Sequence, residues 1–391
     1  MSSLSTDSAY SLQQKQRIRI AVALFFFGQG LGFATWASRI PSIKTSLGLS
    51  EAELGTLLLM IPIGQLVTLP ISAFLVNKFG SHRVLPWAAF LYAFVLILIG
   101  LSPNVWYLGA SLFLFGMAGN MGNISVNTQG VLAEEIYGKP IMSSFHGAWS
   151  LAGFSGALLG FLSMQLELPS MQHFIGMFLL LTINILWNKR LLVPEQPKQK
   201  EKEEKSKYKP DWMIIQLGIL GFFSMATEGA MFEWSGVYFS EVIHAPEKLV
   251  ILGFGSFMVM MALGRFIGDG IISKLGRRRT LQLSGLLMFA GMLTSVLFPN
   301  LYICTLAFML VGLGVACNVP TVYSVAGKHK TIPAGVALAM VSSISFLGFL
   351  MAPPLIGYIA ELFSLQYSFA LFSLFGLLMF VMVSRMRRSE M

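Results

Sequence analysis

The chain has 391 residues, of which 55% are hydrophobic and only 12% are charged, and its mean hydropathy is +0.70. A soluble globular protein carries about 25% charged residues, and a disordered chain combines low hydrophobicity with high net charge, so both classes are excluded. The apolar runs are roughly 20 residues long and unbroken, which argues against an outer-membrane barrel with its short alternating strands. The composition therefore predicts an all-α membrane protein with several spans.

Twelve apolar runs follow a polar N-terminal tail at 1–17. A membrane-spanning helix needs about 20 apolar residues, so each run is long enough to cross a bilayer. The first run is too long for the core of a cleaved signal peptide, and we expect it to remain as the first span. The predicted spans are 18–38, 53–76, 84–102, 105–133, 140–164, 171–193, 212–240, 248–273, 280–298, 301–326, 332–362 and 365–384.

Basic residues in alternate loops set the predicted orientation. Most of the 27 Lys and Arg residues fall in the two tails, the middle of the chain and every second loop. The positive-inside rule then places both termini in the cytoplasm and requires an even number of spans. The net charge of +9 is thus interpreted as a topology signal rather than a nucleic-acid surface. We expect a multi-pass protein of the bacterial inner membrane.

A hydrophilic stretch at 194–211 divides the chain nearly in half. It contains charges of both signs, several prolines and no apolar periodicity, which is typical of a solvated linker. We expect this linker to be cytoplasmic and to join a six-helix bundle at 18–193 to a second one at 212–385. A short cytoplasmic tail at 386–391 follows.

The two halves repeat each other in sequence. Trp36 in the first predicted span is matched by Trp234 in the seventh, Gly80 after the second by Gly276 after the eighth, and Gly160 by Gly357. Local matches at a nearly constant offset indicate a duplicated six-span unit. Repeats of this kind are used by secondary transporters to form a site near the bilayer midplane.

Two short basic loops resemble the cytoplasmic loop motif of the major facilitator superfamily. The first contains Lys78, Gly80 and Arg83, and the second contains Gly276 and Arg277. A glycine permits the tight reversal between helices. The resemblance implies two pseudo-symmetric six-helix bundles around a central cavity. The residues that we assign to gating are Lys78, Gly80, Arg83, Glu134, Arg265, Asp269, Gly276 and Arg277.

Further segments resemble the MosC-like branch of this superfamily along nearly the whole chain. They are Trp36-Ala-Ser-Arg39-Ile-Pro41, Asn123-Ile-Ser-Val-Asn127, Met142-Ser-Ser-Phe-His146-Gly, Glu228-Gly-Ala-Met-Phe-Glu233-Trp234 and Gly264-Arg265-Phe-Ile-Gly268-Asp269. The branch usually has Asp at the positions of Asn123 and Glu233. The resemblance implies transport of a small polar solute, sugar-like or inositol-like, by alternating access.

Ionisable side chains at membrane depth are the candidates for proton coupling. Glu228 and Glu233 fall in the middle and outer half of the seventh predicted span, and His146 falls early in the fifth. A carboxyl group in a low dielectric holds a proton more readily, and an imidazole titrates near neutral pH. The alternative for each is a structural group hydrogen-bonded to a neighbouring helix. Arg265 and Asp269, spaced i,i+4, are predicted to pair along one helix face.

Polar and aromatic residues in the spans are the candidates for a solute cavity. Asn120, Asn123 and Asn127 lie on one helical stripe, and Glu134 continues it toward the cytoplasm as a gate or a loop anchor. Trp36 and Trp234 either stack on a sugar ring or belong to an interfacial aromatic belt. Arg39 either binds an acidic group of the solute or caps the outer end of its span. Gln29 and Gln65 complete the set.

No grouping typical of an enzyme occurs in the sequence. There is no phosphate-binding loop, no metal-ligand spacing and no nucleophile elbow, so we expect no cofactor and no direct use of ATP. The expected partners are a small-molecule solute, protons and the lipid bilayer, with no nucleic acid, and the expected state is a monomer. Two alternatives remain open: a proton-driven exporter of amphipathic compounds, and a non-transporting receptor or scaffold with the same fold.

Overall fold

A computed structural model describes residues 10–138, 141–194, 209–329, 331–332 and 334–386, with the backbone alone at 143, 269, 334 and 335. This part of the chain is helical, without strands, which confirms the all-α prediction. Eleven of its helical segments are long and apolar enough to cross a membrane. The one predicted span that is not among these eleven, 105–133, corresponds to α5 (Val105–Tyr137), which has 33 residues and carries the predicted asparagine stripe. Most of the predicted linker at 194–211 lies outside the described residues.

The chain forms two compact units. Unit 1 consists of Met1–Arg39 and Met60–Lys202, and unit 2 consists of Ile40–Leu59 and Glu203–Met391. The first helix, α1 (Leu12–Leu47), therefore contributes its first part to unit 1 and its last turns to unit 2.

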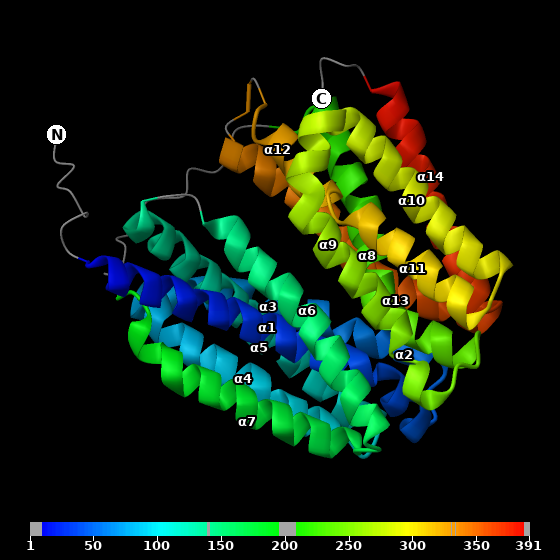
Figure 1. Ribbon diagram of the computed structural model, residues 1–391, viewed down its shortest axis with the longest axis horizontal. Helices are drawn as coiled ribbons and strands as arrows, with labels where there is room; N and C mark the ends of the chain where they lie inside the picture. The colour runs from blue at the N-terminus through cyan, green and yellow to red at the C-terminus, as the bar shows by residue number, and fades with distance from the viewer. Residues whose placement is uncertain (1–9, 139–140, 195–208, 330, 333, 387–391) are drawn as a thin grey trace. The chain divides into compact units, whose positions relative to one another are not determined.

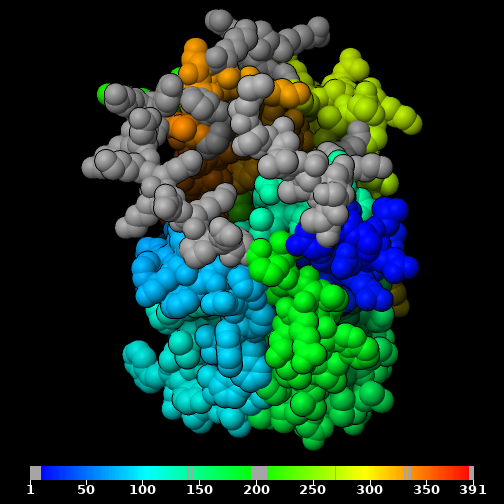
Figure 2. Space-filling model, turned by 90° about the vertical axis from the view of Figure 1, so that its left-hand side faces the viewer, coloured from blue at the N-terminus to red at the C-terminus, as the bar shows by residue number. Residues whose placement is uncertain are grey.

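Unit 1 contains most of the first six predicted spans (Figure 1). Its other helices are α3 (Met60–Phe79), α4 (Ser81–Gly100), α5, α6 (Met142–Gln165), α7 (Ser170–Asn188) and the 3-10 helix η2 (Lys189–Leu191). Figure 2 shows the side chains of α4 and α7 side by side over one face of this unit. Exposed apolar residues on these two helices include Trp87, Phe90, Leu179, Ile183 and Trp187. An apolar exposed surface of this kind is suited to contact with lipid chains.

Unit 2 contains the remaining helices. They are α2 (Glu51–Leu58), α8 (Trp212–Glu241), η3 (Glu247–Leu249), α9 (Leu252–Leu275), α10 (Arg277–Leu297), α11 (Leu301–Val315), α12 (Asn318–Ala326), α13 (Ala334–Leu362) and α14 (Leu365–Arg385). The largest buried interfaces in this unit join α8 to α13 and α10 to α14. Cys304 and Cys317 are buried within it and are not joined by a disulfide bond.

The two units repeat the same close helix contacts. A Cβ at Gly116 on α5 would lie 1.9 Å from the carbonyl oxygen of Ile61 on α3. In unit 2, a Cβ at Gly312 on α11 would lie 2.3 Å from the carbonyl oxygen of Phe257 on α9. Both pairs share one offset in the sequence (116 and 312, 61 and 257). Small residues allow the backbones of membrane helices to approach this closely. The duplication predicted from sequence is therefore present in the packing.

The predicted tight reversals also occur at equivalent glycines. Gly80 between α3 and α4 has φ 82° and ψ 144°, and Gly276 between α9 and α10 has φ 78° and ψ 158°. This backbone region is open almost only to glycine. It explains why a glycine stands at the centre of both basic loops.

The first helix is longer than the predicted span 18–38. It continues through Pro41 and ends at Leu47. The predicted span ended at residue 38, before Pro41, and proline usually breaks helices in water. Membrane helices tolerate an internal proline when neighbouring groups fill its surroundings. Here the Pro41 ring lies against Gly236 of α8, where a Cβ would be 2.9 Å from the ring.

Candidate functional site

An ion pair in unit 2 joins two helices at membrane depth. Arg265 on α9 donates from its Nη2 to Oε1 of Glu228 on α8 at 3.1 Å. The Glu228 side chain is 12% exposed and that of Arg265 is 29% exposed. The sequence predicted Asp269 as the partner of Arg265; the side chain of Asp269 lies outside the described residues. The geometry thus places a charged group of each sign together midway along α8 and α9.

Glu233 lies on the same helix, five residues after Glu228, in a different environment. Its side chain is buried at 2% exposure. Its Oε2 makes no hydrogen bond to any residue that the structure describes. Burying a carboxylate oxygen without a hydrogen-bond partner is unfavourable. The two glutamates therefore differ: Glu228 is ion-paired and Glu233 is fully buried.

The two tryptophans at repeat-equivalent positions are both fully buried. Trp36 and Trp234 have 0% exposure. The indole Nε1 of each makes no hydrogen bond to the described part of the chain. An interfacial aromatic belt would leave the rings at the surface. Their burial argues against that alternative.

Arg39 is buried and connects three elements of unit 1. It is 4% exposed. Its Nε donates to Nδ1 of His173 on α7 at 3.1 Å, and its Nη2 donates to Oγ of Ser163 on α6 at 2.7 Å. The same Nη2 also donates to the carbonyl oxygen of Leu168 at 3.0 Å. The guanidinium fork suits this arrangement of several acceptors. Arg39 therefore connects α1 to the end of α6 and the start of α7.

The asparagine stripe of α5 has mixed surroundings. Asn120 accepts a hydrogen bond from Oγ of Ser72 on α3 at 3.1 Å. Asn127 donates to Oδ1 of Asn123, one turn earlier, at 2.7 Å, and Asn123 is exposed. Gln65 on α3 is half-buried. Asn123 is thus the exposed member of the stripe, while Asn120 and Asn127 are both half-buried.

Gln29 lies between α1 and α5. Its Nε2 donates to the carbonyl oxygen of Gly119 at 3.2 Å. A Cβ at Gly122 would lie 2.3 Å from the same Nε2, so this glycine provides the space for the amide. The contact favours a packing role for Gln29.

The residues assigned to gating in unit 1 lie around short connections. Lys78 lies over the rings of Phe74 and Phe79, at 5.4 and 5.3 Å from their centroids, which are cation–π distances. Arg83 is exposed near the start of α4.

Glu134 and His146 flank the connection between α5 and α6. Oε2 of Glu134 accepts from the backbone N–H groups of Ile141 and Met142 at 2.7 and 2.8 Å, so it anchors the start of α6. His146 is exposed, and its ring lies edge-on to Phe26 with centroids 5.3 Å apart. In unit 2, Arg277 donates to Oγ of Ser324 at 3.3 Å.

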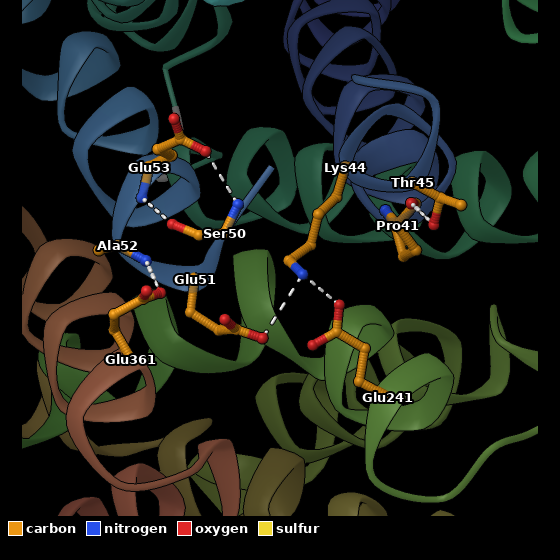
Figure 3. Close-up of polar contacts among 9 residues, drawn as sticks. All are labelled: Pro41, Lys44, Thr45, Ser50, Glu51, Ala52, Glu53, Glu241 and Glu361. Carbon is orange, nitrogen blue, oxygen red and sulfur yellow. Dashed lines mark hydrogen bonds and ion pairs between the residues drawn. The ribbon is translucent and has the colours of Figure 1, made fainter. Parts of the chain in front are cut away.

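A charged cluster that the sequence analysis did not predict lies in unit 2. Lys44, in the last turn of α1, contacts Oε1 of Glu241 at the end of α8 and lies 3.5 Å from Oε1 of Glu51 at the start of α2. Figure 3 shows the ammonium group of Lys44 directed toward both carboxylates. The sequence contains one signal of this geometry: Ser50 and Glu53 form a capping box, which fixes the start of α2. Among the described residues, no cluster of His, Cys, Asp and Glu could hold a metal ion.

Comparison with known proteins gives one consistent result. The family model described as Major Facilitator Superfamily matches residues 20–333. The membrane protein MosC of Rhizobium meliloti is 33% identical over 344 residues, covering 87% of this chain and 83% of MosC. An uncharacterized MFS-type transporter of Yersinia pestis is 31% identical over 354 residues, covering 90% of this chain and 91% of that protein. The crystal structure of a D-xylose-proton symporter has the same fold, with a TM-score of 0.76 at 15% identity, covering 96% of this chain and 98% of that one.

Proposed function

Because this chain belongs to the major facilitator superfamily and is a membrane-spanning transporter, we propose that it moves a small polar, sugar-like or inositol-like solute together with protons. The observation that carries the proposal is the Glu228–Arg265 ion pair, with the buried carboxyl group of Glu233 on the same helix. The D-xylose-proton symporter of the same fold supports the choice of solute class.

The ion pair provides a physical route for coupling. Protonation of Glu228 removes its negative charge and releases the Nη2–H of Arg265 that the carboxylate accepts. That N–H can then be donated to a hydroxyl oxygen of the solute. Loss of the proton restores the carboxylate, which competes with the solute for the guanidinium. Proton binding and solute binding would then favour each other.

We also propose an orientation and a domain organisation for the chain. Both termini face the cytoplasm of a bacterial cell, and the monomer consists of two six-helix bundles joined by the linker at 194–211. The basic loops that follow α3 and α9 support this orientation through the positive-inside rule. Glu134, Lys78 and Arg277 act at the cytoplasmic ends of the helices.

The test is solute uptake into proteoliposomes under an imposed pH gradient, with labelled pentoses, hexoses and inositols as probes. Glu228→Gln is expected to abolish the dependence of uptake on the gradient while solute exchange without a gradient continues. Glu247→Gln, an exposed acid on η3, is the matched control and is expected to behave as the unaltered protein. Unchanged gradient dependence after replacing both Glu228 and Glu233 by glutamine would reject the coupling assignment.

A further inference from the structure

Ile40–Leu59, here called the connecting segment, joins the first predicted span to the second and packs with unit 2. It contains the end of α1 and all of α2. Lys44 is only 8% exposed, although it is a lysine in the last turn of a helix. Its Nζ binds Oε1 of Glu241 and lies 3.5 Å from Oε1 of Glu51 (Figure 3). One of these acids belongs to the connecting segment itself, and the other belongs to α8.

The rest of the connecting segment forms a close backbone contact with α13. A Cβ at Gly357 would lie 2.4 Å from the carbonyl oxygen of Glu51, and a Cβ at Gly55 would lie 3.0 Å from the Cα of Gly357. The hydroxyl groups of Thr56 and Tyr358 are 2.9 Å apart. The same helix also buries Leu54, Leu57 and Leu58, and the Ala52 N–H donates to Oε2 of Glu361 on α13 at 3.4 Å. The charged cluster around Lys44 is therefore one part of the attachment, and it is the part that a change of charge alone can alter.

We infer that Lys44 binds two carboxylates while the connecting segment is attached to α8 and α13, and only one when the segment detaches from them. The inference rests on the proposed alternating-access function, in which a route to the outer side must open. In the attached state Lys44 is shared by Glu51 and Glu241. In the detached state Glu241 stays with α8, while Glu51 moves with Lys44 and keeps the ammonium group paired.

The two acids then have opposite effects on the equilibrium. Glu241 attracts Lys44 only in the attached state, so it stabilises attachment. Glu51 attracts Lys44 in both states, but in the attached state its charge also lies close to that of Glu241, and like charges repel. Glu51 therefore stabilises the detached state relative to the attached one. A static surface cluster would not give opposite effects, because each acid would stabilise the bound position of Lys44 in the same direction.

The test is thiol cross-linking across the contact, in detergent, without solute or gradient. Thr56 and Tyr358 are replaced by cysteine, and a short bifunctional thiol reagent measures how often α2 lies on α13. The two native cysteines are buried and remain in place. Glu241→Gln is expected to slow cross-linking, and Glu51→Gln to accelerate it, each by about threefold, the change that a partly exposed ion pair gives. Glu247→Gln is the control, with an unchanged rate.

A shift of both glutamine variants in the same direction, or rates equal to the control, would overturn the inference. Glu241→Asp and Glu51→Asp, which shorten the side chains but keep their charges, serve as a second pair if a glutamine variant does not fold. They are expected to change the rate with the same signs and smaller size. Since no proton gradient is involved, failure of proton coupling at Glu228 would leave this result intact. Opposite shifts in the cross-linking rate, found together with uptake that does not depend on the gradient, would support the inference about Lys44 and reject proton coupling at Glu228.

Discussion

Replacing Gly276 by alanine should destabilise the protein even though there is room for the added methyl group. Apart from its neighbours in the chain, no atom of the described residues lies within 4 Å of the position that a Cβ would occupy, so the substitution creates no clash. The backbone there has φ 78° and ψ 158°, a region that L-residues with a side chain rarely adopt. Holding a residue in such a conformation costs about 1–3 kcal/mol. That strain is the whole expected effect.

A second glycine of α9 supplies the matched control. Gly270 lies inside the helix, and a Cβ at this position also meets nothing within 4 Å. Alanine there removes backbone freedom from the unfolded chain and should stabilise the helix by about 0.5–1 kcal/mol. The same chemical change is therefore expected to have opposite signs at two positions six residues apart. Because both sites are open, packing cannot account for the difference.

The assay is equilibrium unfolding in mixed detergent micelles, followed by tryptophan fluorescence and circular dichroism. Gly276→Ala should lower the midpoint and Gly270→Ala should raise it, with a separation of about 1.5–4 kcal/mol in the free energy of unfolding. Gly80→Ala should resemble Gly276→Ala, because Gly80 has φ 82°. A shift of the same sign for Gly276→Ala and Gly270→Ala would refute the reasoning from backbone strain.

Three further substitutions test contacts inside each unit. Arg39→Lys should lower thermal stability by about 1–3 kcal/mol, because a single ammonium group cannot reproduce the guanidinium fork; an unchanged midpoint would contradict this. Gly122→Ala should cost about 1 kcal/mol by displacing the Gln29 amide, and this cost should disappear in a Gln29→Ala background, which a double-mutant cycle measures. Asp211 caps α8 and bonds His329, so Asp211→Ala should cost about 1 kcal/mol whereas Asp211→Asn retains most of the cap. Burial alone would raise the pKa of Asp211, but the Ile214 N–H and His329 outweigh it and hold this pKa below the ordinary 3.8. The charge-dependent stabilisation is therefore complete above pH 3.8 and is lost as the pH falls through the lowered pKa, so the difference from Asp211→Asn should vanish in that acid range.

Much of the architecture follows from physical constraints that act along the sequence. A bilayer demands apolar helices of a minimum length, and a tight reversal with positive φ demands glycine. These two requirements explain why the helical fold and the equivalence of Gly80 and Gly276 were predicted correctly. Apolar character alone is an incomplete guide to the length of a helix, as α5 shows. Its asparagine stripe lowers its apolar character, yet α5 is one of the longest helices that the structure describes.

The partners of polar side chains are less accessible to sequence reasoning. Arg265 bonds Glu228, which is 37 residues away in the sequence. The predicted pairing of Arg265 with Asp269 stays a prediction, because the side chain of Asp269 lies outside the described residues. The contact with Glu228 depends on how α8 and α9 are rotated about their axes, and the residues next to Arg265 in the sequence do not determine this rotation. The same holds for α5: spacing placed Asn120 and Asn127 on one stripe, but their partners lie on α3 and on α5 itself.

The cluster around Lys44 was missed for a more specific reason, and the signals that define it were present in the sequence. Ending the first span before Pro41 leaves Lys44 in a loop, where a charge needs no partner. The helix in fact ends one residue before Gly48, which has φ 63°, and the Leu49 N–H bonds the carbonyl oxygen of Lys44. This is the helix-ending arrangement that a glycine favours. The capping box of Ser50 then starts α2 at once. A glycine stop followed within two residues by a serine start leaves no flexible loop, so the charges on either side have fixed directions and must be matched.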